Sequence, residues 1–164
     1  MIKLLETDDQ LLECTKIIRE SFQTVAVEFH LTPEDAPTNP AFTRFEHVKV
    51  SVSKGVVLYG LYRDLRMIGC IAIEKSKDDH SIYYIERLAV VPSDRHKGYG
   101  KLLMDFASNK IIENGGKEVS IGIIDENSRL KKWYLDYGFV ETGKKRFSHL
   151  PYTVCFMKKV LVSP

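Results

Sequence analysis

A basic turn at residues 95–100, which contains two glycines, is the part of the chain whose residue types suggest chemistry most directly. It follows the apolar run 88–92, which reads as the end of a buried strand, and it precedes an amphipathic helix. The first N–H groups of a helix have no partners within it, and the helix dipole adds partial positive charge. Gly98 and Gly100 allow a ligand to approach the backbone, and an arginine and a lysine add charge. We therefore expect a phosphate-bearing cofactor.

Two common phosphate-binding motifs do not fit this turn. A Walker loop would need Gly at position 95 and Ser or Thr at position 102, where Arg95 and Leu102 stand. A dinucleotide fingerprint would need Gly or Ala at position 103, where Leu103 stands. Both nucleotide-binding classes are excluded.

The spacing Arg95-x-x-Gly98-x-Gly100 resembles the (Gln/Arg)-x-x-Gly-x-(Gly/Ala) motif of the GNAT superfamily of N-acetyltransferases. The resemblance implies that the turn holds the pyrophosphate of acetyl-CoA. It also implies an enzyme that moves an acetyl group from acetyl-CoA to a primary amine by direct attack of that amine.

A second pattern farther along the chain, Asn127-x(6)-Tyr134-x(3)-Gly138-Phe139, is also similar to this superfamily. Members commonly carry the Asn at the start of a helix and the Tyr four residues before a Gly-Phe pair. Leu130 departs from the pattern, because a small residue such as Ala is typical there. The fit of the cofactor arm at that position is therefore left open.

The predicted elements follow the order β-α-α-β-β-β-α-β-α-β-β, which matches the GNAT order over essentially the whole chain. This is an α+β (mixed α/β) fold with a central mixed, mostly antiparallel sheet flanked by helices, in one domain over residues 1–164. A capping box at Thr7-x-x-Gln10 begins the first helix, and residues 23–39 are expected to be irregular. The predicted strands are 2–5, 56–63, 67–75, 81–91, 118–125, 139–147 and 153–161, and the later helices are 40–55, 98–114 and 128–137.

Glu86 is the candidate general base. An alkyl ammonium must lose a proton before it can attack a thioester. Glu86 interrupts an apolar strand, where burial should raise its pKa, and many GNAT enzymes place a catalytic Glu on this strand. Alternatively, Glu86 pairs with a basic residue of a neighbouring strand or faces solvent. Arg87 is a poor partner, since adjacent strand residues point to opposite faces.

The resemblance implies that Tyr134 is the general acid for the departing CoA thiolate and that Asn127 contacts the pantetheine arm. Alternatively, Asn127 or Ser128 serves only as a helix N-cap, and Tyr134 packs in the core beside Trp133. The backbone of the strand before the turn is expected to contact the thioester. The full set of expected cofactor contacts is Leu88, Ala89, Val90, Arg95, His96, Lys97, Gly98, Tyr99, Gly100, Lys101 and Asn127.

The acceptor is less well defined. Glu28 and its acidic neighbours on the 23–39 connection would suit a cationic amine, whereas the basic residues 144–146 would suit an anion. His149 and Tyr152, between the last two strands, are weaker candidates for acceptor contacts. We expect a small-molecule primary amine, because one compact domain offers no extension for docking a peptide. A protein or peptide amine stays open as an alternative, as does a CoA-binding sensor or interaction module without turnover.

Composition limits the partners. A net charge of +2 gives no bulk attraction for nucleic acid, and no apolar run approaches the ~20 residues needed to span a membrane. The three cysteines lie among apolar residues, which favours reduced core thiols and a cytoplasmic protein. No pair of histidines has zinc-ligand spacing, so no metal is expected. Dimerisation through a terminal strand stays open.

Overall fold

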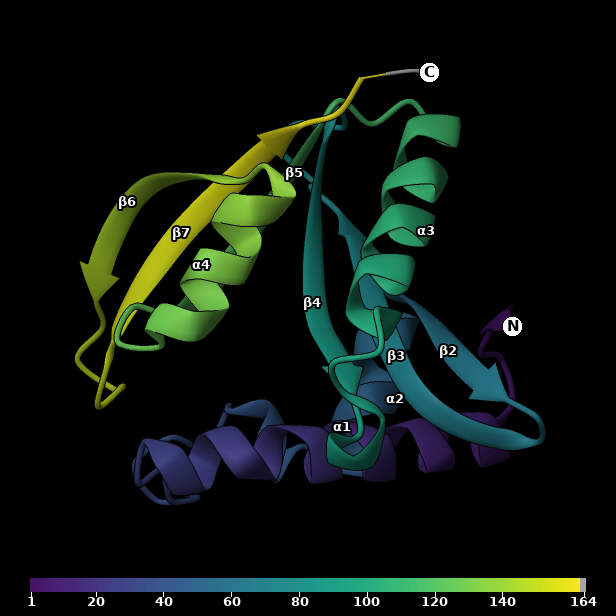
Figure 1. Cartoon of the computed structure of the whole chain (residues 1–164), viewed down its shortest axis with the longest axis horizontal. Helices are drawn as coiled ribbons and strands as arrows, with labels where there is room; N and C mark the ends of the chain where they lie inside the picture. The colour runs from purple at the N-terminus through teal and green to yellow at the C-terminus, as the bar shows by residue number, and fades with distance from the viewer. Residues whose placement is uncertain (163–164) are drawn as a thin grey trace.

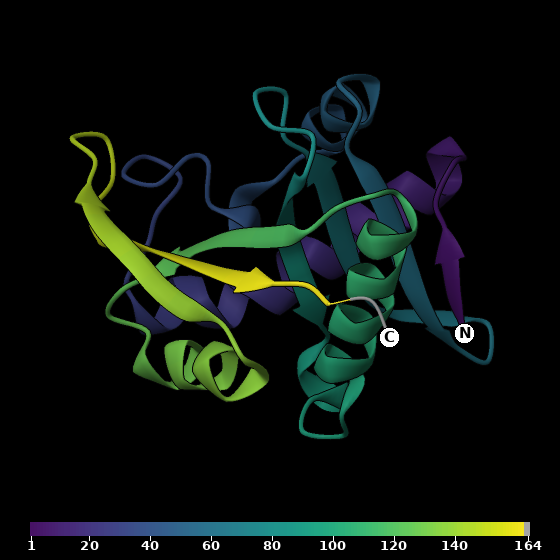
Figure 2. The same cartoon turned by 90° about the horizontal axis from the view of Figure 1, so that it is seen from above.

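The computed structural model describes residues 1–162 and contains a seven-stranded sheet with helices on both faces (Figures 1 and 2). The strand order is β1-β2-β3-β4-β5-β7-β6, and every neighbouring pair is antiparallel except β4 and β5. The strands are β1 (Ile2–Leu4), β2 (Val57–Arg63), β3 (Arg66–Lys75), β4 (Ile82–Val90), β5 (Glu118–Ile124), β6 (Val140–Arg146) and β7 (Thr153–Val160). The helices are α1 (Asp8–Glu28), α2 (Phe45–Ser53), α3 (Tyr99–Glu113) and α4 (Ser128–Tyr137), with short 3₁₀ helices η1 (Pro40–Phe42) and η2 (Pro92–Asp94). The expected fold class is confirmed.

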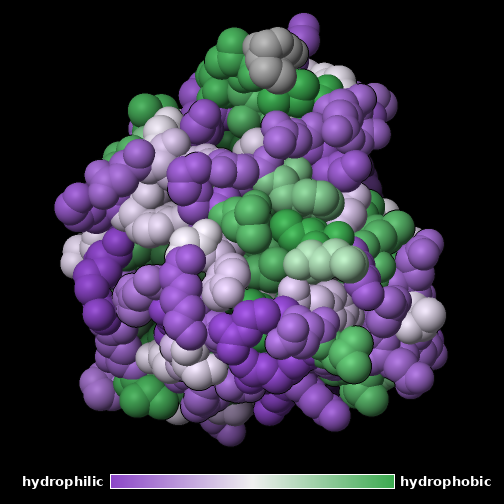
Figure 3. All heavy atoms as spheres, turned by 45° about the vertical axis from the view of Figure 1, so that its right-hand side comes forward, coloured by the Kyte–Doolittle hydropathy of each residue, from purple (hydrophilic) through white to green (hydrophobic). Residues whose placement is uncertain are grey.

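The core lies between the sheet and the helices on its two faces. Ile18 of α1, Ile71 of β3 and Leu103 of α3 are fully buried in it. Cys14, Cys70 and Cys155 are buried free thiols, as the sequence predicts. On the face shown in Figure 3, hydrophilic residues surround a central apolar area. Within residues 1–162, no helix is long and apolar enough to cross a membrane.

The first helix is longer than the sequence predicts. The expected capping box is present, with Gln10 N–H donating to Thr7 Oγ1 at 3.2 Å, but α1 continues through the supposedly irregular residues 23–28. Ala26 is buried there and belongs to a small apolar cluster with Leu31 and Ala36, so tertiary packing extends the helix. The prediction gave too much weight to the prolines, the first of which (Pro33) comes only after the helix has ended.

The predicted helix 40–55 is instead two helices. Asn39 caps the first as expected, since its Oδ1 accepts from Ala41 N–H at 3.0 Å, but η1 ends at Phe42. Thr43 and Arg44 are extended, and α2 begins at Phe45. Arg19 of α1 donates to the Thr43 carbonyl at 2.9 Å, and this tertiary contact holds the break open.

The centre of the sheet divides where β4 leaves β5. The two parallel strands pair only at residues 82–84 of β4, after which β4 runs on to Val90 without β5 beside it (Figure 1). On its other side β4 carries a bulge against β3, because Cys70 pairs with Ala89 but Ala72 pairs with Glu86. Arg87, inside this bulge, has a left-handed φ of 52°. Residues 86–90 therefore present backbone that β5 does not pair.

Gly69 lets β3 approach the bulged part of β4 and should resist substitution. A Cβ at this position would lie 2.6 Å from the Ala89 carbonyl oxygen, which is backbone and cannot rotate away. We expect Gly69→Ala to lower the free energy of unfolding by about 1–3 kcal/mol through overpacking, as measured by urea denaturation. Gly143→Ala is the matched control, because a Cβ there meets nothing within 4 Å, and its effect should stay within about 0.5 kcal/mol. Equal losses in both variants would contradict this account.

Candidate active site

The turn before α3 presents a row of free backbone donors. His96 and Gly98 both have a left-handed φ, of 62° and 84°. In the part of the chain that the structure describes, no hydrogen bond uses the N–H groups of residues 96–101. Successive N–H groups in such a turn form a concave anion site, and the N-terminus of the 15-residue helix α3 reinforces it. The backbone alone can therefore hold a diphosphate.

The two glycines of the turn are required for different reasons. Gly98 needs its freedom for a φ of 84°, whereas a Cβ there would meet nothing within 4 Å. At Gly100 a Cβ would lie 3.4 Å from the Trp133 ring, so this glycine allows the turn to pack against α4. The sequence analysis explained both glycines by the close approach of a ligand to the backbone. It did not place Trp133 at the site.

The basic side chains of the turn point to protein groups. The Arg95 guanidinium donates to the Val90 carbonyl at 3.0 Å, the Thr24 hydroxyl at 3.0 Å and the Ser21 carbonyl at 2.6 Å. Lys97 donates to Asp94 at 3.3 Å. The positive charge expected of these two side chains is thus hydrogen-bonded to protein groups. Of the other expected contacts, Lys101 pairs with Asp105 at 2.7 Å and His96 is exposed.

Glu86 lines a hollow of about 400 Å³ on β4. Its partner on β3 is Ala72, and Glu74 is paired with Tyr84, so Glu74 and Glu86 are diagonal neighbours on one face of the sheet. Burial raises the pKa of Glu86, and the negative charge of Glu74 raises it further. The raised pKa agrees with the prediction, but nothing in the sequence indicated Glu74, because strand register was unknown. The hollow is lined by Glu74, Lys75, Ser76, Lys77, Asp78, Tyr84 and Glu86.

Arg87 does not behave as strict strand alternation predicts. The bulge interrupts the two-residue period, and the positive charge of Arg87 partly offsets the raised pKa of Glu86. Within residues 1–162 its Nη1 atom is buried and makes no hydrogen bond. Within residues 1–162 the two side chains form no ion pair, so Arg87 affects Glu86 through its charge and not as a direct partner.

Tyr134 and Asn127, the two predicted site residues on and next to α4, differ in how many contacts each side chain makes. Tyr134 is 6% exposed and lies edge-on to Trp133 and Phe139, with ring centres 5.0 and 5.3 Å away. Burial raises the pKa of its hydroxyl well above the usual range, which keeps the proton on the oxygen. Asn127 is the N-cap of α4, since its Oδ1 accepts from Leu130 N–H at 3.2 Å. Its amide nitrogen is not used by this cap.

The predicted acceptor residues do not form one cluster. Glu28 pairs with Arg129 of α4 at 3.2 Å, which joins the end of α1 to α4. Tyr152 is half-buried against the apolar cluster at the end of α1, and burial raises its pKa. His149 is exposed and packs edge-on to Phe147, with ring centres 5.6 Å apart.

A group of potential metal ligands lies at the end of β5. Oxygen or sulfur atoms of Asp125, Glu141 and Cys155 lie within 4.8 Å of one another. Lys131 pairs with Asp125, and Lys144 pairs with both carboxylates, at 3.3 Å to Asp125 and 3.7 Å to Glu141. Ammonium groups thus already balance the negative charge that a metal ion would need.

Known proteins share this architecture. A family model described as an acetyltransferase (GNAT) domain matches residues 32–160. A protein described as a GNAT-family acetyltransferase from Desulfovibrio desulfuricans is 16% identical over 99% of both chains, with a TM-score of 0.78. The ribosomal-protein-S18-alanine N-acetyltransferase of Escherichia coli is 15% identical over 100% of this chain and 95% of its own, with a TM-score of 0.76. The PaiA N-acetyltransferase of Thermoplasma acidophilum, solved with coenzyme A, is 18% identical over 98% of this chain and 99% of its own, with a TM-score of 0.73.

Because the family model matches most of its length, the chain belongs to the GNAT acetyltransferase family. This membership confirms the enzyme class that the turn and the second motif predicted, with acetyl-CoA as the co-substrate.

Substitution of Gly98 should test the anion-binding role of the turn separately from the stability of the fold. We expect Gly98→Glu to weaken acetyl-CoA binding at least tenfold, about 1.4 kcal/mol, because it strains the turn and places a carboxylate near the free N–H groups. Isothermal titration calorimetry measures this. Gly115→Glu is the control, since Gly115 has the same φ of 84° and open surroundings at the far end of α3. Similar losses in both variants would show that strain, not the anion site, is responsible.

The decrease of kcat/KM at low pH should depend on both Glu86 and Glu74. A base must be deprotonated, so a raised pKa of Glu86 moves the acid limb of kcat/KM to higher pH than an ordinary Glu gives. We expect Glu74→Gln to move this limb to lower pH, because it removes a negative charge that raises the pKa. The other charged groups near Glu86 are Arg87, Lys75, Lys77 and Asp78.

Asp78→Asn is the control for that profile, since Asp78 lines the same hollow but does not contribute to the shift of the Glu86 pKa. An unmoved limb in Glu74→Gln, or equal movement in the control, would contradict the coupling.

Proposed function

We propose that this chain transfers the acetyl group of acetyl-CoA to a small-molecule primary amine, with Glu86 as general base and Tyr134 as general acid. The observation that carries the proposal is the position of Glu86. It stands in an open hollow, one residue before the bulge, where β4 has already separated from β5. A proton acceptor there lies next to backbone that can receive a cofactor.

The cofactor would lie along β4 and across the N-terminus of α3. The free N–H groups of residues 96–101 would bind its pyrophosphate. The backbone of Leu88 and Ala89, which β5 does not pair, would contact the pantetheine and the thioester. The Val90 carbonyl already accepts from Arg95, so it is less available than its neighbours. Asn127, the N-cap of α4, would contact the pantetheine arm through its amide nitrogen, which the cap does not use.

The acceptor nitrogen must lose two protons, and the departing thiolate must gain one. Glu86 would take the first proton from the acceptor ammonium, and the free amine would attack the thioester carbonyl. Collapse of the tetrahedral intermediate breaks the C–S bond. Tyr134 would give its proton to the CoA thiolate and would be reprotonated by the second proton, which leaves the nitrogen of the new C–N bond. The raised pKa of Glu86 supports its role, because Glu86 binds a proton more readily than an ordinary Glu. Burial keeps the proton on the Tyr134 hydroxyl at neutral pH, so a proton is present there to be donated.

The acceptor proposal rests on the hollow beside Glu86. Its volume of about 400 Å³ suits a small molecule, and the carboxylates of Glu74 and Asp78 suit a cationic amine. Peptide amines are the second candidate, because a structure of similar fold is a ribosomal-protein-alanine N-acetyltransferase. Another structure of similar fold, an aminoglycoside 6′-N-acetyltransferase, agrees with a small-molecule amine.

A thiol-release assay over small amines, polyamines, amino acids and peptides tests this function. We expect the wild type to prefer small amines, and Glu86→Gln to lower kcat by about 10²–10⁴-fold while retaining acetyl-CoA binding. Tyr134→Phe should also lower kcat without loss of binding. Glu86→Gln should be no less stable than the wild type at neutral pH. A raised carboxyl pKa means that stability falls as pH rises through it, and Gln removes that loss.

Each alternative predicts a different result in the same assay. Faster acetylation of peptides than of small amines would overturn the acceptor class. Acetyl-CoA binding without turnover on any amine would identify a cofactor sensor.

A further inference from the structure

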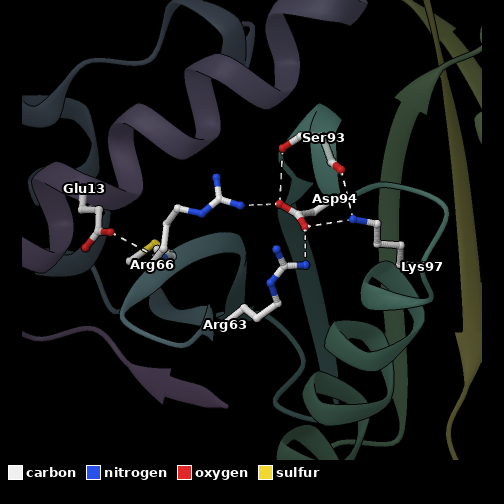
Figure 4. Close-up of polar contacts among 7 residues, drawn as sticks. Glu13, Arg63, Arg66, Ser93, Asp94 and Lys97 are labelled. Atoms are coloured by element: carbon white, nitrogen blue, oxygen red, sulfur yellow. Dashed lines mark hydrogen bonds and ion pairs between the residues drawn. The ribbon is translucent and has the colours of Figure 1, made fainter.

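Asp94 is a buried carboxylate that joins the β2–β3 hairpin to the turn before α3 (Figure 4). The residue is 1% exposed, and its side chain accepts four hydrogen bonds. The donors are Arg63 Nη1 at 2.9 Å, Arg66 Nη2 at 2.7 Å, Lys97 Nζ at 3.3 Å and Ser93 Oγ at 3.3 Å. Both carboxylate oxygens are thus shared between a guanidinium and a second donor.

This carboxylate contacts the anion-binding turn through Lys97. Asp94 is the last residue of η2, two residues before the row of free N–H groups begins. Lys97 lies inside the turn, and Tyr99 is the first residue of α3.

The opposite side of the turn is held by Arg95, through its three hydrogen bonds to α1 and β4. A turn with a non-glycine residue such as His96 at positive φ keeps its shape only when its surroundings fix it. Asp94 and Arg95 supply those surroundings from two directions.

We propose that Asp94 is a positioning residue, which holds residues 95–100 in the shape that binds the pyrophosphate of acetyl-CoA. This inference rests on the function proposed above. Asp94 is too buried to touch the cofactor itself. Replacing it with a neutral amide would leave Arg63, Arg66 and Lys97 without their shared anion, and the turn would lose its attachment to the hairpin.

Asp94→Asn tests the proposal when two acetyl donors are compared. Acetyl-CoA carries the pyrophosphate, whereas acetyl-pantetheine carries the same thioester without the pyrophosphate or the nucleotide. We expect the KM for acetyl-CoA to rise at least tenfold with kcat within about twofold, and kcat/KM for acetyl-pantetheine to stay at the wild-type value. Asp8→Asn removes the carboxylate of an exposed ion pair with Lys49 and should change neither donor's constants.

A second variant guards against loss of folding in Asp94→Asn. Arg66→Gln removes the 2.7 Å bond at a side chain that is 59% exposed, and it should give a smaller rise in the KM for acetyl-CoA. If instead it equals or exceeds the effect of Asp94→Asn, the arginines bind the cofactor directly and the proposal fails.

Two further results would contradict the positioning role of Asp94 or the proposed function. An unchanged KM for acetyl-CoA, or parallel losses with both donors, would overturn the positioning role. If the wild type neither binds acetyl-CoA by calorimetry nor transfers its acetyl group, the proposed function fails and this inference falls with it.

Discussion

The site depends on one constraint: backbone N–H and C=O groups inside a protein must find partners, and at this site the fold leaves one side of β4 unpaired by β5. The parallel pairing of β4 with β5 ends at Tyr84, although both strands continue. A few residues farther along, the N–H groups of 96–101 also make no hydrogen bond to any part of residues 1–162. Unpaired backbone at both places can be satisfied only by water or by a bound molecule, and this supports the proposal that the cofactor binds across the two places.

The two halves of the divided sheet are held at a distance by contacts between helices. Tyr137 of α4 donates to Asp105 of α3 at 2.6 Å, and Trp133 packs against Gly100 at the start of α3. The end of α1 is joined to α4 through Glu28 and its arginine partner. These contacts fix α4, which carries Tyr134 and Asn127, relative to the strand that carries Glu86. The separation is therefore part of the packed structure.

Local sequence patterns predicted most of the helices and strands. The pairing of strands and the tertiary contacts could not be predicted from the sequence. The helix 128–137 is observed with the predicted bounds, because a side-chain cap and a C-terminal glycine at 138 mark its ends. The errors at residues 23–28 and 43–44 come from tertiary contacts that override local signals. The coupling of Glu74 with Glu86 depends on strand register and on a bulge, and neither leaves a mark in the sequence. Asp94 likewise gained its role from two arginines about thirty residues earlier in the chain.

Two carboxylates, Glu86 in the middle of β4 and Asp94 just after this strand, show how surroundings decide what an acidic side chain can do. Burial alone would raise the pKa of Asp94, but Lys97, Arg63 and Arg66 outweigh it, and the pKa falls below its usual value. Burial also raises the pKa of Glu86, and there the nearest carboxylate adds to the shift while Arg87 only partly offsets it. An acid surrounded by cations stays ionised and serves as a fixed anchor. An acid beside another acid is poised to take up a proton, which is the property that a general base near neutral pH requires.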